Sequence, residues 1–113
     1  MFDSELLHAY LISAARNGES VTYSQALASH GYAFTRPKMR ALCTLLCDID
    51  ALGRSRDEPE LAVLVVRQSD GLPGQGWWTS GGGDNYQGPW VGPKARRHVQ
   101  RLQERAFTYW QSR

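Results

Sequence analysis

Residues 61–79, LAVLVVRQSDGLPGQGWWT, form the segment around which the rest of the chain can be arranged. Residues 61–66 are an unbroken apolar run rich in β-branched side chains, which is typical of a buried strand. Residues 69–71 and 73–74 favour turns, and residues 76–79 can return as a second strand. The segment therefore predicts a β-hairpin. An isolated hairpin is marginal in water, so we expect helices to cover one of its faces.

The chain has 113 residues, of which 42% are hydrophobic and 21% charged, as expected for one soluble folded domain. It contains no apolar run of membrane-spanning length, and its start lacks the pattern of a signal peptide, so we expect a cytoplasmic protein. Cys43 and Cys47 fall one turn apart on a predicted helix, and a metal would need two more ligands. We therefore expect reduced thiols and neither a metal nor another cofactor.

Three helices are predicted before the hairpin. Asp3 can cap the first helix, and Thr22 with Gln25 forms a capping box for a short second helix that runs to about residue 29. Residues 20–22, just before it, are β-prone. Thr35 caps a third helix that should end at Gly53. Apolar residues at helical spacing predict its buried face: Met39, Leu42, Cys43, Leu46, Ile49 and Leu52.

A glycine-rich loop, residues 80–92, separates the hairpin from a final helix, residues 93–113, that opens with Pro93. We therefore divide the single domain 1–113 into helices plus hairpin (1–79), this loop and this helix. The heptad-like spacing of the helix also allows a coiled-coil homodimer. Its apolar stripe consists of Ala95, Val99, Leu102, Ala106 and Tyr109.

Charge is unevenly distributed along the chain. The last 20 residues carry six Lys or Arg against Glu104 alone, whereas the first 93 residues sum to −3. Acidic residues crowd positions 48–60, just before the predicted hairpin. A polyanion would therefore meet the C-terminal helix first.

Helix, short β segment, two helices and a hairpin follow one another in the order of a winged helix, an α+β fold. In that fold the third helix meets the DNA major groove and the hairpin forms the wing. This order predicts a winged-helix-like domain with an additional C-terminal helix.

Residues 21–78 also resemble the winged-helix DNA-binding domain of alkylguanine-DNA alkyltransferases and alkyltransferase-like proteins. VTYSQALASHGY, then MRALCTLLCDID, a proline, an apolar strand and a glycine turn are similar to that family's pattern. The resemblance implies that Tyr23 manages the target phosphate and that Arg40 replaces a flipped base. The family's Pro-Cys-His-Arg is replaced by residues 59–62, Pro-Glu-Leu-Ala, so alkyl transfer is excluded at that position.

Two groups of side chains are candidates for binding. The candidates for nucleic acid, which the winged-helix order indicates to be DNA, are Tyr23, Arg36, Lys38, Arg40, Thr44, Arg96, Arg97 and Arg101. The candidates for a protein partner are Trp77, Trp78 and Trp90, because alternation on a strand would expose one of the two adjacent tryptophans. The basic residues are also compatible with a solvated helix face, and the outward tryptophan is more often covered by the loop than offered to a partner.

Two classes of function follow. The first is a non-enzymatic nucleic-acid-binding winged helix, such as a small bacterial or phage regulator. The second is a protein-interaction module on the same scaffold, such as an adaptor, inhibitor or immunity protein. The acidic positions 48–60 favour the second, because they lie where DNA would sit. No spacing of Ser, His and Asp specifies a catalytic triad, so we do not expect an enzyme.

Overall fold

The computed structural model describes residues 3–79 and 86–113, and it confirms the α+β class with mostly helical structure. The elements in chain order are α1 (Ser4–Arg16), β1 (Val21–Thr22), α2 (Tyr23–Ala28), α3 (Arg36–Ser55), the short 3-10 helix η1 (Ala62–Leu64), β2 (Val65–Val66), α4 (Gln75–Trp77) and α5 (Pro93–Gln111).

The predicted helix starts are confirmed by hydrogen bonds at each cap. The Asp3 carboxylate accepts from the backbone N–H groups of residues 5 and 6. Thr22 and Gln25 form the reciprocal capping box of α2, with distances of 3.0 and 2.9 Å. The Thr35 hydroxyl accepts from the N–H of Lys38 at the start of α3. These contacts satisfy backbone donors that have no partner within the helix itself.

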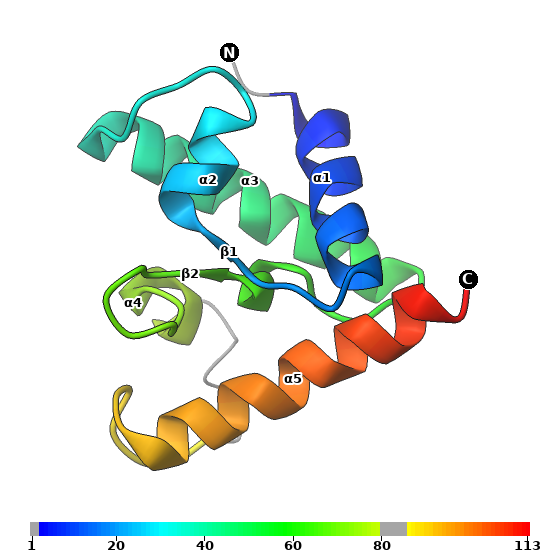
Figure 1. Ribbon diagram of the computed structural model, residues 1–113, viewed down its shortest axis with the longest axis vertical. Coiled ribbons are helices and arrows are strands. Elements are labelled where there is room, and N and C mark those ends of the chain that lie inside the picture. Colours follow the sequence, from blue (N-terminus) through cyan, green and yellow to red (C-terminus); the bar gives the residue numbers. More distant parts are fainter. Residues whose placement is uncertain (1–2, 80–85) are drawn as a thin grey trace.

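β1 and β2 form a two-stranded parallel sheet, in which Val21 lies opposite Val65 and Thr22 opposite Val66. Figure 1 shows the sheet and η1 in the middle of the molecule, with α1, α2 and α3 on one side and α5 crossing the other. Both residues of β2 are buried, because helices cover it from both sides. The apolar run of residues 61–66 is therefore a central segment of the core.

The predicted hairpin is wrong. Only Val65 and Val66 of the apolar run are extended, and they pair with β1 rather than with a return strand. The chain then closes a tight turn, in which the N–H of Arg67 donates to the carbonyl of Leu72 and the Asp70 carboxylate accepts from the N–H of Leu72. The expected return strand, residues 76–79, is helical.

Hydrogen bonds explain why residues 76–79 form a helical turn. The N–H of Trp77 donates to the carbonyl of Gly74, and the hydroxyl of Thr79 donates to the carbonyls of Gln75 and Gly76. This segment therefore satisfies backbone and side-chain hydrogen bonds within its own turn. Trp77 and Trp78 are both buried in consequence, at 8% and 4% exposure, so the expectation that one of them points outward is also wrong.

α3 runs two residues beyond its predicted end at Gly53, which is buried inside the helix. The following loop turns back onto this end of the helix, where the N–H of Glu58 donates to the carbonyl of Gly53 at 2.9 Å. Leu52 was expected in the buried face of α3 but is 41% exposed, because the helix buries a narrower stripe than its apolar pattern suggests.

The C-terminal helix completes the core. Ala95, Val99 and Ala106 are fully or almost fully buried, and α5 packs extensively against α1. The side-chain amide of Gln103 donates to the carbonyl of Val63, at 2.9 Å, and so ties α5 to η1. The apolar stripe of α5 is therefore used within the chain.

Two further features concern membrane spans and metal ligands. None of the helices in residues 3–79 and 86–113 has the length and apolar character needed to cross a membrane. In the same part of the chain, no three His, Cys, Asp or Glu side chains are grouped so that they could hold a metal ion.

Candidate functional site

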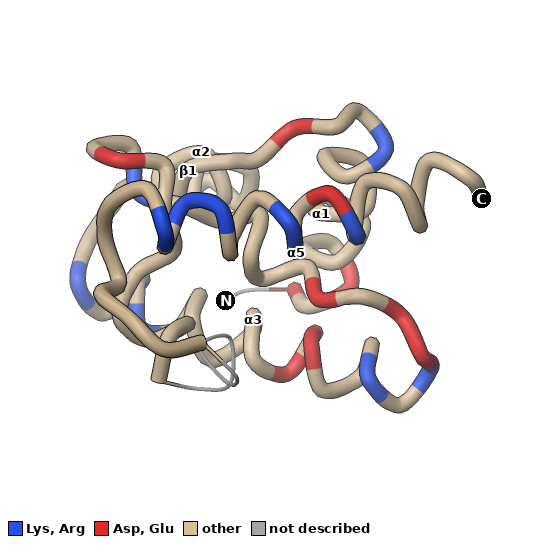
Figure 2. The backbone as a smooth tube through the Cα atoms, turned by 90° about the horizontal axis from the view of Figure 1, so that it is seen from below, with Lys and Arg blue, Asp and Glu red and all other residues tan. Residues whose placement is uncertain are grey.

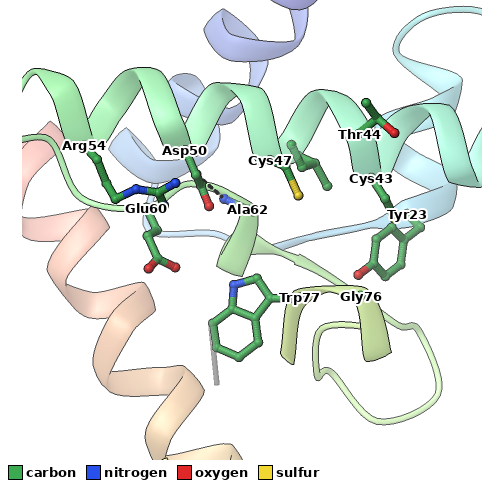
Figure 3. A pocket seen from close by; sticks show the side chains of 11 residues that line it. Tyr23, Cys43, Thr44, Cys47, Asp50, Arg54, Glu60, Ala62, Gly76 and Trp77 are labelled. Carbon is green, nitrogen blue, oxygen red and sulfur yellow. Dashed lines mark hydrogen bonds between the residues drawn. The ribbon is translucent and has the colours of Figure 1, made fainter. Parts of the chain in front are cut away.

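A cavity of about 210 Å³ lies between α3 and the segment from η1 to α4. Figure 3 shows side chains of α3 above it, Tyr23 at one end and Trp77 below. The lining residues are Tyr23, Cys43, Thr44, Leu46, Cys47, Asp50, Arg54, Glu60, Ala62, Gly76 and Trp77. Tyr23 and Thr44 are the only two predicted nucleic-acid contacts among them.

Asp50 is the buried acid of this cavity, with 8% of its surface exposed. Its Oδ1 atom accepts from the backbone N–H groups of Leu61 and Ala62, at 2.8 and 3.1 Å. Burial raises the pKa of Asp50 to about 6, even though these hydrogen bonds act in the opposite direction. The nearby charge of Glu60 raises the pKa further, whereas that of Arg54 lowers it. Asp50 thus anchors the start of η1, although burial disfavours the charged form of its carboxylate.

Trp77 brings an unsatisfied donor to the same cavity. Its Nε1 atom is buried and has no hydrogen-bond partner among the described residues. Figure 3 shows this nitrogen on the edge of the indole that faces Asp50 and Ala62. The adjacent Trp78 differs, because its Nε1 atom donates to the carbonyl of Pro73 at 3.3 Å. The two indoles pack edge to face, with centroids 4.7 Å apart.

Tyr23 closes the other end of the cavity and is 6% exposed. Its hydroxyl accepts a 2.8 Å hydrogen bond from the N–H of Gly74, which fixes the segment before α4 against α2. Burial raises the pKa of Tyr23 above its usual value. Burial, followed by the proximity of Cys47, also raises the pKa of the Cys43 thiol. These groups are therefore protonated near neutral pH.

The basic candidates of α3 lie at the helix start, away from the acidic end of the same helix. Arg36 and Arg40 are exposed. The Lys38 ammonium lies 4.0 Å from the ring centroid of Tyr32, in a cation–π contact. Thr44 is exposed on the next turn, and its hydroxyl donates to the carbonyl of Arg40.

The basic candidates of α5, Arg96, Arg97 and Arg101, are exposed. One N–H group of Arg101 lies 3.1 Å from Nδ1 of His98. Figure 1 shows the start of α3 and the start of α5 on the side of the molecule that carries α4. Figure 2 shows basic positions along α5, and acidic positions gathered along the second half of α3 and the loop that follows it. The uneven charge of the sequence therefore appears in the fold as a basic α5 and an acidic second half of α3.

Of the three aromatic candidates, Trp90 alone is exposed, at 40%. Its ring stacks on Trp78, with centroids 6.1 Å apart and planes within 4° of parallel. Trp77 and Trp78 belong to the core and cannot offer a surface to a partner while the fold is intact. The loop predicted over residues 80–92 falls partly on residues 80–85, which lie outside the described residues.

Sequence reasoning missed the role of Asp50 and Glu60, which it grouped with surface acids. The available signal was the position of Asp50 on the predicted apolar face of α3, between Ile49 and Gly53. A carboxylate there needs a partner. The partner is a backbone segment 11 residues later, which no spacing rule identifies.

Comparisons with protein-family models, with curated proteins and with solved structures find no match to this chain.

Proposed function

We propose that this protein is a non-enzymatic nucleic-acid-binding protein, a small regulator of bacterial or phage type that acts in the cytoplasm on DNA through a helix-turn-helix without a hairpin wing, since residues 61–79 form no hairpin. α2 and α3 would form its helix-turn-helix. The observation that carries the proposal is the exposure of arginines at the starts of both α3 and α5, on the side of the molecule that carries α4.

Phosphate binding is the chemistry that these arginines fit best. Guanidinium groups bind phosphate with two parallel hydrogen bonds, and exposed arginines on two helices can bind several successive phosphates. Arg40 is exposed, as the base-replacing role that the family resemblance implies would require. Tyr23 would act indirectly, because its hydroxyl already binds Gly74 and its ring is buried.

Binding of a fluorescent duplex, measured at about 50 and about 200 mM salt, tests this function. We expect affinity to fall steeply with salt. Replacing Arg36 and Arg40 by Ala should weaken binding, and the loss of the Arg36 phosphate contact should reduce the log–log salt slope by roughly 1.

Arg56 offers the matched control, since it is exposed but lies among the acidic residues after α3. The Arg56→Ala variant should bind like the parent protein. The proposed DNA surface would be contradicted if the Arg56→Ala variant lost as much duplex affinity as the Arg36 and Arg40 variant. It would also be contradicted if the parent protein did not bind the duplex at low salt.

The alternative is a protein-interaction module, favoured by Trp90 and by Val91, which is 56% exposed. These neighbours form an apolar patch at the start of α5, and the acidic residues of positions 48–60 form a second distinctive surface.

A homodimer through α5 would have to use the exposed face of the helix, because its apolar stripe packs inward. Light scattering after size exclusion of the parent protein tests that dimer directly, and a monomer at all concentrations would rule it out.

A further inference from the structure

The cavity between α3 and α4 contains two polar groups, and no hydrogen bond joins them in the described structure. Trp77 presents a buried N–H group without an acceptor. Asp50 uses Oδ1 for two backbone bonds, which leaves its second carboxylate oxygen toward the cavity. A buried donor without a partner costs free energy, and native proteins rarely leave one unexplained.

We propose that this cavity binds a small, uncharged, planar molecule with an amide edge. Its carbonyl oxygen would accept from Nε1 of Trp77, and its adjacent N–H group would donate to Asp50. Leu46, Ala62 and the ring of Trp77 supply apolar walls for the flat faces of such a molecule.

The two polar groups discriminate among classes of ligand. An ammonium group would pair with Asp50 but leave the Trp77 N–H group unsatisfied. A carboxylate or phosphate would satisfy Trp77 but meet Asp50 and Glu60, two acids that outnumber the one basic lining residue, Arg54. A neutral amide edge offers one acceptor and one donor side by side and therefore satisfies both.

The size and charge of the cavity favour a free molecule over a base that remains attached to nucleic acid. A volume of about 210 Å³ suits a single small ring system. Asp50 and Glu60 line the cavity and Asp48 is exposed on the same half of α3, so they would repel the phosphates of a strand that delivers a base. This inference does not depend on the proposed function, because it uses none of the exposed arginines.

The test uses 2-pyridone as the probe and the indole N–H signals of the ¹⁵N-labelled protein as the readout. Titration should shift the Trp77 signal downfield in a saturable manner, with a dissociation constant that is roughly millimolar for so small a ligand. N-methyl-2-pyridone keeps the carbonyl but lacks the donor, and it should bind at least about tenfold more weakly because it leaves the second carboxylate oxygen of Asp50 without a hydrogen bond.

Three variants separate this site from a general effect on the fold. Trp77→Phe keeps an aromatic wall and Asp50→Asn keeps the side-chain shape, and each should weaken 2-pyridone binding at least about tenfold. Binding to the Trp77→Phe variant is followed by one-dimensional ligand line broadening, because that variant lacks the reporting indole. Trp110→Phe is the control, because Trp110 also has a buried Nε1 atom without a partner among the described residues but does not line the cavity. The Trp110→Phe variant should bind 2-pyridone with the same dissociation constant as the parent protein.

Several outcomes would overturn the inference. These are no saturable shift of the Trp77 signal, equal binding of the N-methyl compound, or equal loss in the Trp110 variant. Displacement of 2-pyridone by single-stranded oligothymidine would show that the site binds a base that is part of a strand. This result would contradict the proposal that the ligand is a free small molecule. A negative duplex-binding experiment would leave all of these results unaffected, so the two proposals fail separately.

Discussion

Asp50 carries its charge where little water reaches it, and two backbone N–H groups hold it there. Those hydrogen bonds favour the carboxylate, but the loss of hydration outweighs them and the pKa rises to about 6. The folded protein therefore binds a proton to Asp50 at a pH where the unfolded chain has already released it.

This raised pKa gives a definite sign to the pH dependence of stability. Below about pH 4 Asp50 is protonated in both states, and as pH rises toward 6 the unfolded state loses its proton first, so the free energy of unfolding falls. The loss attributable to Asp50 is at most about 3 kcal/mol, because each pKa unit corresponds to about 1.4 kcal/mol.

Urea unfolding of the parent and an Asp50→Asn variant, at about pH 4 and about pH 7.5, checks this expectation. The amide still offers an oxygen to the two N–H groups but does not ionise. The stability of the parent relative to the variant should decrease between the two pH values. A constant difference would show that Asp50 does not titrate differently on folding.

Tyr23 also connects distant parts of the chain, through its hydrogen bond with Gly74. Tyr23→Phe removes the acceptor of the Gly74 N–H group, and we expect the free energy of unfolding to fall by about 1 kcal/mol. Chemical denaturation measures this change. Tyr109 is only partly buried and its ring lies against the guanidinium of Arg113, so Tyr109→Phe offers a comparison that should change stability much less.

At the scale of elements, helix starts and the β-prone residues of β1 were predictable, and the pairing of the strands was not. A cap depends on side chains within three residues of the backbone groups that they satisfy, so the signals at Asp3, Thr22 and Thr35 could be read directly. Residues 61–66 have strand-like composition, but so does any fully buried segment. Their division into η1 and β2 follows from pairing with β1 more than 40 residues away, which composition does not encode.

The capping box of α2 leads to a prediction at this scale. Thr22→Ala removes the side-chain acceptor of the Gln25 N–H group at the start of a helix of only six residues, and we expect a loss of about 1 kcal/mol. Thr22→Ser should retain most of the stability, because Ser also caps. Thermal unfolding followed by circular dichroism compares the three proteins; similar melting temperatures for the Ala and Ser variants would contradict a capping role.

At the scale of the whole molecule, α5 completes the core by packing against α1 and η1. Removing residues 93–113 would expose the apolar side chains of α1, including Leu7 and Leu11, which are fully buried. We expect the truncated chain to lose cooperative unfolding and near-ultraviolet circular dichroism, and to bind a hydrophobic dye. A shortened protein that still unfolds in one sharp transition would show that residues 1–92 fold alone.

The positions of the helices along the chain could be predicted from the sequence, because caps, apolar helical spacing and the proline at position 93 act over a few residues. These features predicted the α+β class, β1 and the starts of the four main helices. The partner of the apolar run, the burial of both Trp77 and Trp78, and the meeting of Asp50 with Trp77 depend on contacts across the fold. Strand pairing and burial depend on which surfaces meet when all helices pack together. A short stretch of sequence contains no information about which distant segment will pack against it.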